Sequence, residues 1–171
     1  MPGNGFTATA ISATQEDILS GMADLLRAEF SEWDTTAIYW TDNPKPEVSQ
    51  NLDLFIQLTP GGGSFNQGIL QGGPRAEETS LVGVTIWRRS VIDDAGRAQD
   101  SLFNTSEGLL KIKRRVLKAL TGKMLVDGSG NQIATGTITP QQALEPDTGA
   151  TDPPLDRLAM YFQVPFDWDL S

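Results

Sequence analysis

The first helical pattern in the chain spans roughly residues 14–30. Thr14 and Asp17 have the spacing of a capping box, in which each side chain accepts a hydrogen bond from the other residue's backbone N–H. The apolar positions that follow recur every three or four residues: Ile18, Leu19, Met22, Leu25, Leu26 and Phe30. We therefore expect a core helix here.

The second helical pattern spans residues 104–125, and its apolar and basic residues are more clearly separated onto opposite faces. Asn104 and Glu107 have the spacing of a capping pair, and Gly122 lies where the helix is expected to end. At 100° per residue, one broad arc is apolar: Leu109, Leu110, Ile112, Val116, Leu117 and Leu120. The opposite side carries a basic ridge: Lys111, Arg114, Arg115 and Lys118. Lys113 falls within the apolar arc, so it must reach water or find a partner at an edge or interface.

Alternating or β-branched segments predict the strands. They span residues 36–40, 51–58, 79–88 and 157–166, with a looser strand at 65–71. Arg88 and Arg89 mark the point where the third strand is expected to leave the core. Pro165 and the terminal DWDLS predict that the closing strand ends at a sheet edge or reaches beyond it.

Segments rich in glycine, proline and polar residues predict the connections. TPGGGS at 59–64 is expected to be a turn, and DGSGNQ at 127–132 a turn between two short extended pieces, 123–126 and 133–138. Residues 139–156 are expected to form a long loop, and residues 1–10 a flexible N-terminal arm.

These elements predict an α/β fold of the α+β type. We expect a mostly antiparallel or mixed sheet of about four to six strands, backed by two helices. At 171 residues the chain is long enough for one core and short for two, so residues 11–171 are expected to form a single domain.

Composition excludes several kinds of chemistry. The chain has no cysteine and no histidine, which removes thiolate nucleophiles, disulfides, cysteine-based zinc sites and the commonest general base. Its net charge of -9 disfavours general affinity for nucleic acid. It has no signal-peptide pattern and no apolar run long enough to cross a membrane. We expect neither a cofactor nor a bound metal.

The basic residues are concentrated in the second helix. Residues 105–123 contain six basic side chains and one acidic one, against seven basic and 21 acidic elsewhere. A basic ridge on an acidic body favours contact with acidic neighbours, including further copies of the chain. The alternative is an ordinary solvated helix face.

Motifs that could carry catalysis have simpler explanations. The glycine clusters lack the Gly-Lys-Ser/Thr sequence of a phosphate-binding loop. DGSGN opens like a calcium loop but lacks the glutamate at the twelfth position. Paired carboxylates occur only among predicted turn or terminal residues, where solvated acids are usual: Glu77 and Glu78, Asp93 and Asp94, and Asp167 and Asp169. We therefore expect a protein that is not an enzyme.

The order of elements, together with TSEGLLKIKRRVLKAL in the second helix and LDRLAMYFQVPF in the closing strand, resembles the tail terminator, or tail completion, proteins of long-tailed bacteriophages. The resemblance covers residues 14–166. It implies a sheet backed by two helices, assembled as a ring, typically a hexamer. Such a ring caps the head-proximal end of the tail tube in the virion, ends tube growth and meets the head connector.

The resemblance also implies the partners: further copies of the chain, the tail tube protein, a head connector or neck protein, and a sheath protein if the tail is contractile. Assembly would take place in the host cytoplasm, without membrane or specific nucleic-acid binding. We expect the interface to include Lys111, Lys113, Arg114, Arg115, Lys118, Arg88 and Arg89.

Three alternatives stay open. One is another neck or head-completion protein, which would share the size, acidity and lack of chemistry. Another is a small acidic enzyme, for which the paired carboxylates would have to converge in one pocket. A third is a single-strand nucleic-acid-binding module that depends on Trp87 and Arg88.

Overall fold

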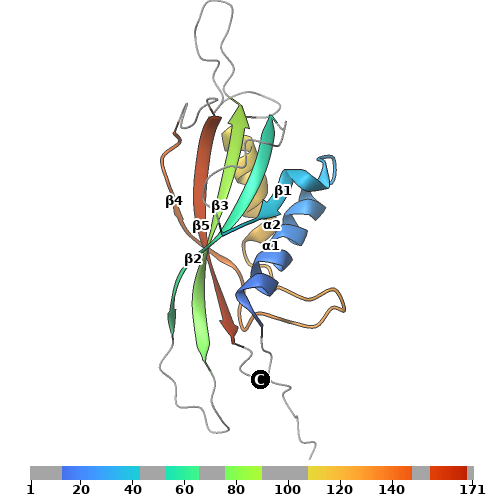
Figure 1. Ribbon diagram of the computed structural model, residues 1–171, viewed down its shortest axis with the longest axis vertical. Coiled ribbons are helices and arrows are strands. Elements are labelled where there is room, and N and C mark those ends of the chain that lie inside the picture. Colours follow the sequence, from blue (N-terminus) through green and yellow to red (C-terminus); the bar gives the residue numbers. More distant parts are fainter. Residues whose placement is uncertain (1–12, 43–52, 66–75, 90–107, 148–154, 169–171) are drawn as a thin grey trace, which may run out of the picture.

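The computed structural model describes residues 13–42, 53–65, 76–89, 108–147 and 155–168 (Figure 1). In chain order, its elements are α1 (Gln15–Glu29), η1 (Thr35–Ala37), β1 (Ile38–Trp40), β2 (Leu54–Phe65), β3 (Glu77–Arg89), α2 (Leu109–Leu120), β4 (Thr139–Ala143) and β5 (Leu155–Asp167). The predicted single α+β domain with two helices and one mixed sheet is confirmed. The expected N-terminal arm lies outside the described residues.

The five strands form one sheet in the order β1-β2-β3-β5-β4. β1 is parallel to β2, and the other neighbouring strands are antiparallel. Both helices pack on one face of the sheet, with α1 beside β1 and β2, and α2 beside β3 and β5 (Figure 1). Apolar residues from both helices and from the inner face of the strands form the main core. Each sheet edge thus has its own helix nearby.

Helix α1 begins as its sequence predicts. The Asp17 backbone nitrogen donates to Thr14 Oγ1 at 3.2 Å, and the Thr14 backbone nitrogen donates to Asp17 Oδ2 at 2.8 Å. Behind this capping box, α1 buries the residues that face the sheet: Ile18, Leu19, Met22, Ala23 and Leu26. Local spacing was sufficient to predict this element.

Helix α2 begins later than predicted. Its first residue is Leu109, and Gly108 is the N-cap, without a side-chain cap. Asn104 and Glu107, the predicted capping pair, lie outside the described residues. Leu110 was predicted to face the core but is 38% exposed. The predicted end is confirmed, because Gly122 follows the helix with a φ of 73°.

The segment TPGGGS, residues 59–64, was predicted to be a turn, and this is wrong. It continues β2, which pairs with β3 from Leu54 to Phe65 with a register shift between Pro60 and Gly63. The bulge absorbs the proline and glycines without ending the strand. Phe65 closes β2 instead of opening a new strand, and the rest of the predicted strand at 65–71 lies outside the described residues.

The predicted loop at 139–156 is also wrong in part. Residues 139–143 form β4, whose five residues are all exposed, and residues 155–156 belong to β5. Exposed edge strands need no apolar alternation, so the sequence pattern did not reveal β4. Residues 148–154 lie outside the described part of the chain.

β5 lies between β3 and β4, and its last residues extend beyond the part that pairs with β4. It pairs with β3 along its whole length. Pro165 is compatible with this position because it lies beyond Gln163, the last residue of β5 that pairs with β4.

The connection from α2 to β4 matches its prediction. Asp127 Oδ1 accepts from the backbone nitrogens of Ser129 and Asn131, each at 2.8 Å, which forms the predicted turn. Val126 and Gln132 pair across it, and Leu125 and Ile133 are buried against the core. These two buried side chains, which flank the turn, therefore hold the connection against the core near α1.

Candidate assembly surface

The two sides of the helix layer have opposite charges. Residues 13–42, which form α1, η1 and β1, contain seven acidic residues and one basic residue, for a net charge of -6. Residues 108–126, which include α2, contain six basic residues and no acidic ones, for a net charge of +6. Because α1 lies beside β1 and β2, and α2 beside β3 and β5, the two charges lie on different sides of the helix layer.

Part of the basic ridge is used inside the subunit. The Arg115 guanidinium pairs with Glu29 and Glu32, and it lies over the Phe30 ring, 4.1 Å from the centroid. Lys118 Nζ lies 3.5 Å from Glu29 Oε2. These contacts join the basic helix to the end of the acidic one.

The ion pair between Arg115 and Glu32 shifts the titration of both of its members. The hydrogen bond from Arg115 lowers the pKa of Glu32, and the hydrogen bond to Glu32 raises the pKa of Arg115. Both groups therefore stay charged over a wider pH range. The predicted role of Arg115 in a subunit interface is untested, but its side chain already has intramolecular partners.

The other ridge residues face solvent. Lys111, Arg114 and Lys118 are exposed on α2, and the Lys118 side chain is 76% exposed despite its contact with Glu29. Lys113 is half-buried and lies on the side of α2 nearest β4. The ridge is therefore divided between a seam with α1 and a surface toward the β4 edge.

The structure separates the other two predicted interface residues from this ridge. Arg88 is only 9% exposed and pairs in register with Asp156 inside the sheet. Arg89 is exposed, and its Nε lies 3.3 Å from Asp53 Oδ1. Arg88 does not mark an exit from the core, because β3 continues to Arg89 between β2 and β5.

A groove lies where α2 meets the β4 edge. Its volume is about 300 Å³. Leu117 and the nearly buried Met160 give it apolar surface, and Lys113 brings a positive charge. The full lining is Lys113, Leu117, Pro140, Gln141, Gln142, Ala143 and Met160. This is the kind of surface that accepts an apolar group with a nearby carboxylate.

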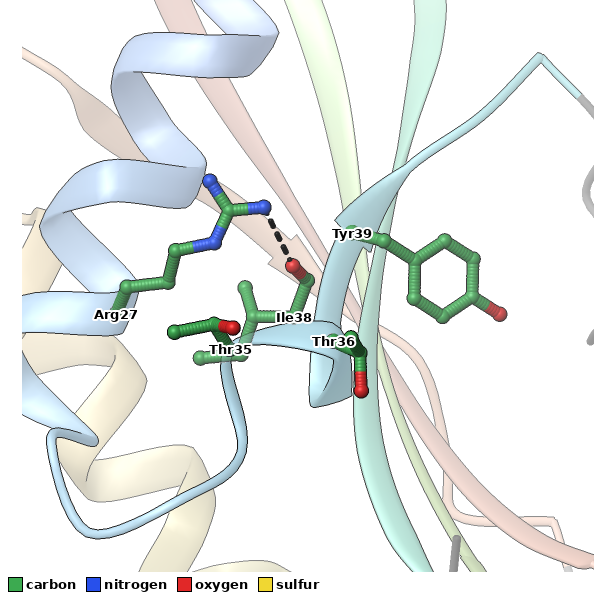
Figure 2. Close-up of a pocket in the computed structure, with 5 residues that line it drawn as sticks. All are labelled: Arg27, Thr35, Thr36, Ile38 and Tyr39. Carbon is green, nitrogen blue, oxygen red and sulfur yellow. Dashed lines mark hydrogen bonds between the residues drawn. The ribbon is translucent and has the colours of Figure 1, made fainter. Parts of the chain in front are cut away.

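The β1 edge has a different shape. A hollow of about 570 Å³ is lined there by Arg27, Thr35, Thr36, Ile38 and Tyr39. Figure 2 shows that the Arg27 guanidinium points to the Ile38 carbonyl oxygen, to which it donates at 2.8 Å, while Tyr39 points away on the other side of the strand. The same guanidinium donates to Asp24 at 3.0 Å. Arg27 thus anchors β1 to α1.

Next to this hollow, Trp40 is the last residue of β1 and is 40% exposed. Asp34 fixes the start of the segment, because its side chain accepts from the backbone nitrogen of Thr36 at 2.8 Å, and this bond lowers the pKa of Asp34. The sequence predicted the strand but not the exposure of its tryptophan, since aromatic residues on strands are usually buried.

The sheet face opposite the helices carries a row of aromatic rings. Tyr39, Phe55 and Trp87 stack across β1, β2 and β3, with ring centroids 6.1 and 6.3 Å apart, and Arg157 of β5 lies 5.9 Å from the Trp87 ring. Trp87 is only 2% exposed. The nucleic-acid alternative needed Trp87 and Arg88 as accessible groups, and both are buried.

The carboxylate pairs are only partly described. Glu78 is buried and accepts a 2.7 Å hydrogen bond from the Trp168 indole nitrogen, and Asp167 is buried at the end of β5. Asp93, Asp94 and Asp169 lie outside the described residues. Among the residues that are described, no group of three or more acidic side chains is placed to hold a metal ion, and no helix is long and apolar enough to cross a membrane.

Comparisons with known proteins give limited similarity. No protein-family model matches the chain, and no curated protein matches it. Among solved structures, it is similar to a chain from the virion of a native gene transfer agent particle, with a TM-score of 0.40 and 15% sequence identity. That similarity covers 88% of this chain and 94% of the other.

Proposed function

We propose that this protein is a structural subunit of a phage-type virion, which assembles with copies of itself into a ring at the head-proximal end of the tail tube. The ring would end tube growth and provide the joint to the head connector. Support comes from the resemblance to tail terminator proteins, which implies one sheet backed by two helices. The described fold has that architecture.

The observation that carries the proposal is the difference between the two sides of the subunit. The β1 side is acidic, whereas the α2 and β4 side is basic and has an exposed edge strand. Unlike surfaces on opposite sides of one molecule favour head-to-tail contacts, and a head-to-tail contact repeats until its rotation closes a ring. A hexamer is the stoichiometry that the resemblance implies.

The proposed partners are the tail tube protein below the ring and a connector or neck protein above it, with a sheath protein if the tail is contractile. None of these contacts requires a catalytic centre. The protein would work through its shape and charge, and we propose that it is not an enzyme.

The test uses purified tail tubes and purified connectors. The protein is added to each, and the products are viewed by negative-stain electron microscopy. We expect density at one end of every tube and arrest of further tube growth. Binding to connectors without binding to tubes would instead support the other neck or head-completion role, and binding to neither would contradict a virion joint.

A further inference from the structure

An exposed tryptophan and an apolar groove lie at opposite edges of the same sheet. Trp40 ends β1, and the groove lies between α2 and β4. β1 and β4 are the two edge strands of the sheet (Figure 1). Side chains two residues apart on a strand share a face, so Trp40 is on the same face as Ile38, which packs in the core beneath the helices. Both features therefore belong to the helix side of the sheet.

Building on the ring proposed above, we infer that Trp40 of one copy inserts into the α2–β4 groove of the next copy. Two unlike surfaces at opposite edges, on the same side of the sheet, can meet when copies stand side by side in one orientation. The same contact then recurs at every junction of the ring.

The size and polarity of the groove favour a tryptophan side chain as its occupant. The groove has a volume of about 300 Å³ and offers Leu117 and Met160 as apolar contacts. Buried tryptophans are frequent anchors of protein interfaces, because their large rings remove much apolar surface from water. Trp40 is 40% exposed in the single subunit, so the insertion would bury surface that is now in contact with solvent.

The charges beside Trp40 and beside the groove favour the same orientation of neighbouring copies. Asp42 follows Trp40 by two residues and is exposed, and Lys113 lines the groove. A carboxylate beside the inserted ring would therefore meet a positive charge. On a larger scale, the exposed Asp34 and Asp42 of one copy would approach the side of α2 that carries Lys113 and Arg114 in the next copy, which favours a second copy of this chain over an unrelated neutral partner.

The experiment measures the native mass of full-length variants by sedimentation velocity, alone and on tail tubes. Trp40→Ala should raise the concentration needed for ring formation by about 30-fold or more, as expected for an interface hot spot. Phe65→Ala removes another exposed aromatic residue, one that lies at the end of β2, and should leave assembly unchanged. Far-ultraviolet circular dichroism would verify that each variant is folded.

A charge swap tests the proposed pair. Lys113→Glu and Asp42→Lys should each weaken assembly, and the double variant should recover most of it. Recovery would be difficult to explain by damage to the fold, because it requires the two substituted residues to meet.

Mixing tests the direction of the contact. Trp40→Ala retains an intact groove, and Lys113→Glu retains an intact tryptophan, so an equimolar mixture should form dimers with one copy of each and grow no further. A ring that forms normally from Trp40→Ala, or a mixture that gives no dimer, would overturn this contact and leave the ring itself standing. A wild-type protein that stays single both alone and on tubes would overturn the proposed function as well.

Discussion

The Arg115 guanidinium lies over the Phe30 ring, with its central carbon 4.1 Å from the ring centroid. Arg115 is partly exposed, whereas Phe30 is almost completely buried. The arginine also pairs with Glu29 and Glu32, so one side chain covers the end of α1 and contacts two of the carboxylates there. The contact joins the two helices that carry opposite charges.

Replacing Arg115 should therefore destabilise the subunit itself. Arg115→Ala removes the cation–π contact and two ion pairs, and we expect the free energy of unfolding to fall by about 1–2 kcal/mol. Urea denaturation monitored by tryptophan fluorescence would measure it. Lys118→Ala is the matched control, since its exposed contact with Glu29 should contribute less than about 0.5 kcal/mol. Equal losses in the two variants would contradict the structural role of Arg115.

Glu32 should contribute to the loss of folding stability at acidic pH. The hydrogen bond from Arg115 lowers the pKa of Glu32 below its ordinary value of 4.5, so the folded state binds this proton less readily than the unfolded state. The resulting stability is fully present above pH 4.5 and is lost as the pH falls through the lowered pKa of the folded state.

The comparison is between the wild-type protein and Glu32→Gln, each unfolded with urea at a series of pH values from 7 to 3. Below about pH 4.5 the wild type should lose more stability than the variant. Asp34 and Asp127 also have lowered pKa values, but both proteins retain them, so the difference isolates Glu32. Parallel pH curves would contradict this account.

A buried hydrogen bond stabilises the sheet face opposite the helices. The Trp87 indole nitrogen donates to Gln57 Oε1 at 3.0 Å, and both residues are buried. Gln57→Leu leaves the indole N–H without this acceptor and should cost about 1–3 kcal/mol. In a double-mutant cycle with Trp87→Phe, the combined loss should be smaller than the sum of the single losses. Strict additivity would indicate that the two side chains are not coupled.

A side chain at Gly61 should destabilise the protein, whereas a side chain at the neighbouring Gly62 should not. A Cβ atom at Gly61 would lie 2.7 Å from the Leu81 carbonyl oxygen, which is backbone in the adjacent strand and has little freedom to move. Gly61→Ala should therefore lower the free energy of unfolding by about 1–3 kcal/mol.

Gly62→Ala provides the control, because a Cβ atom there meets no atom within 4 Å. Its stability should stay within about 0.5 kcal/mol of the wild type. Thermal unfolding of the two variants side by side distinguishes them. Equal melting temperatures would mean that β2 and β3 are less closely packed at this bulge than the structure indicates.

The elements that the sequence predicted well are those whose signals are local. The Thr14 capping box and the apolar spacing behind it place α1 to within a residue or two, and the alternation from Leu158 to Phe166 identifies β5. Errors arose where pairing across the sheet decides the structure. Residues 59–64 stay extended because β3 pairs with them, and β4 exists because β5 supplies its hydrogen-bonding partner.

The candidate surface was predictable only in outline. Helical spacing placed Arg115 on the basic ridge, but its partners Glu29 and Glu32 lie more than 80 residues earlier, and only the packing of α2 on α1 brings them together. Lys113 was identified as a residue that needs an edge, and the structure places it at the groove beside β4. The exposure of Trp40 had no sequence signal, because it follows from the position of β1 at the end of the sheet.

The most direct test of the central claim is the native mass of the purified protein, measured over a range of concentrations. The chain has a mass of 18.5 kDa. A subunit that assembles through unlike edges should convert from single chains to one closed species containing a fixed whole number of copies, with few intermediates. A mass that stays at one chain at every concentration, with or without tail tubes, or that stops at a symmetric dimer, would contradict head-to-tail ring assembly.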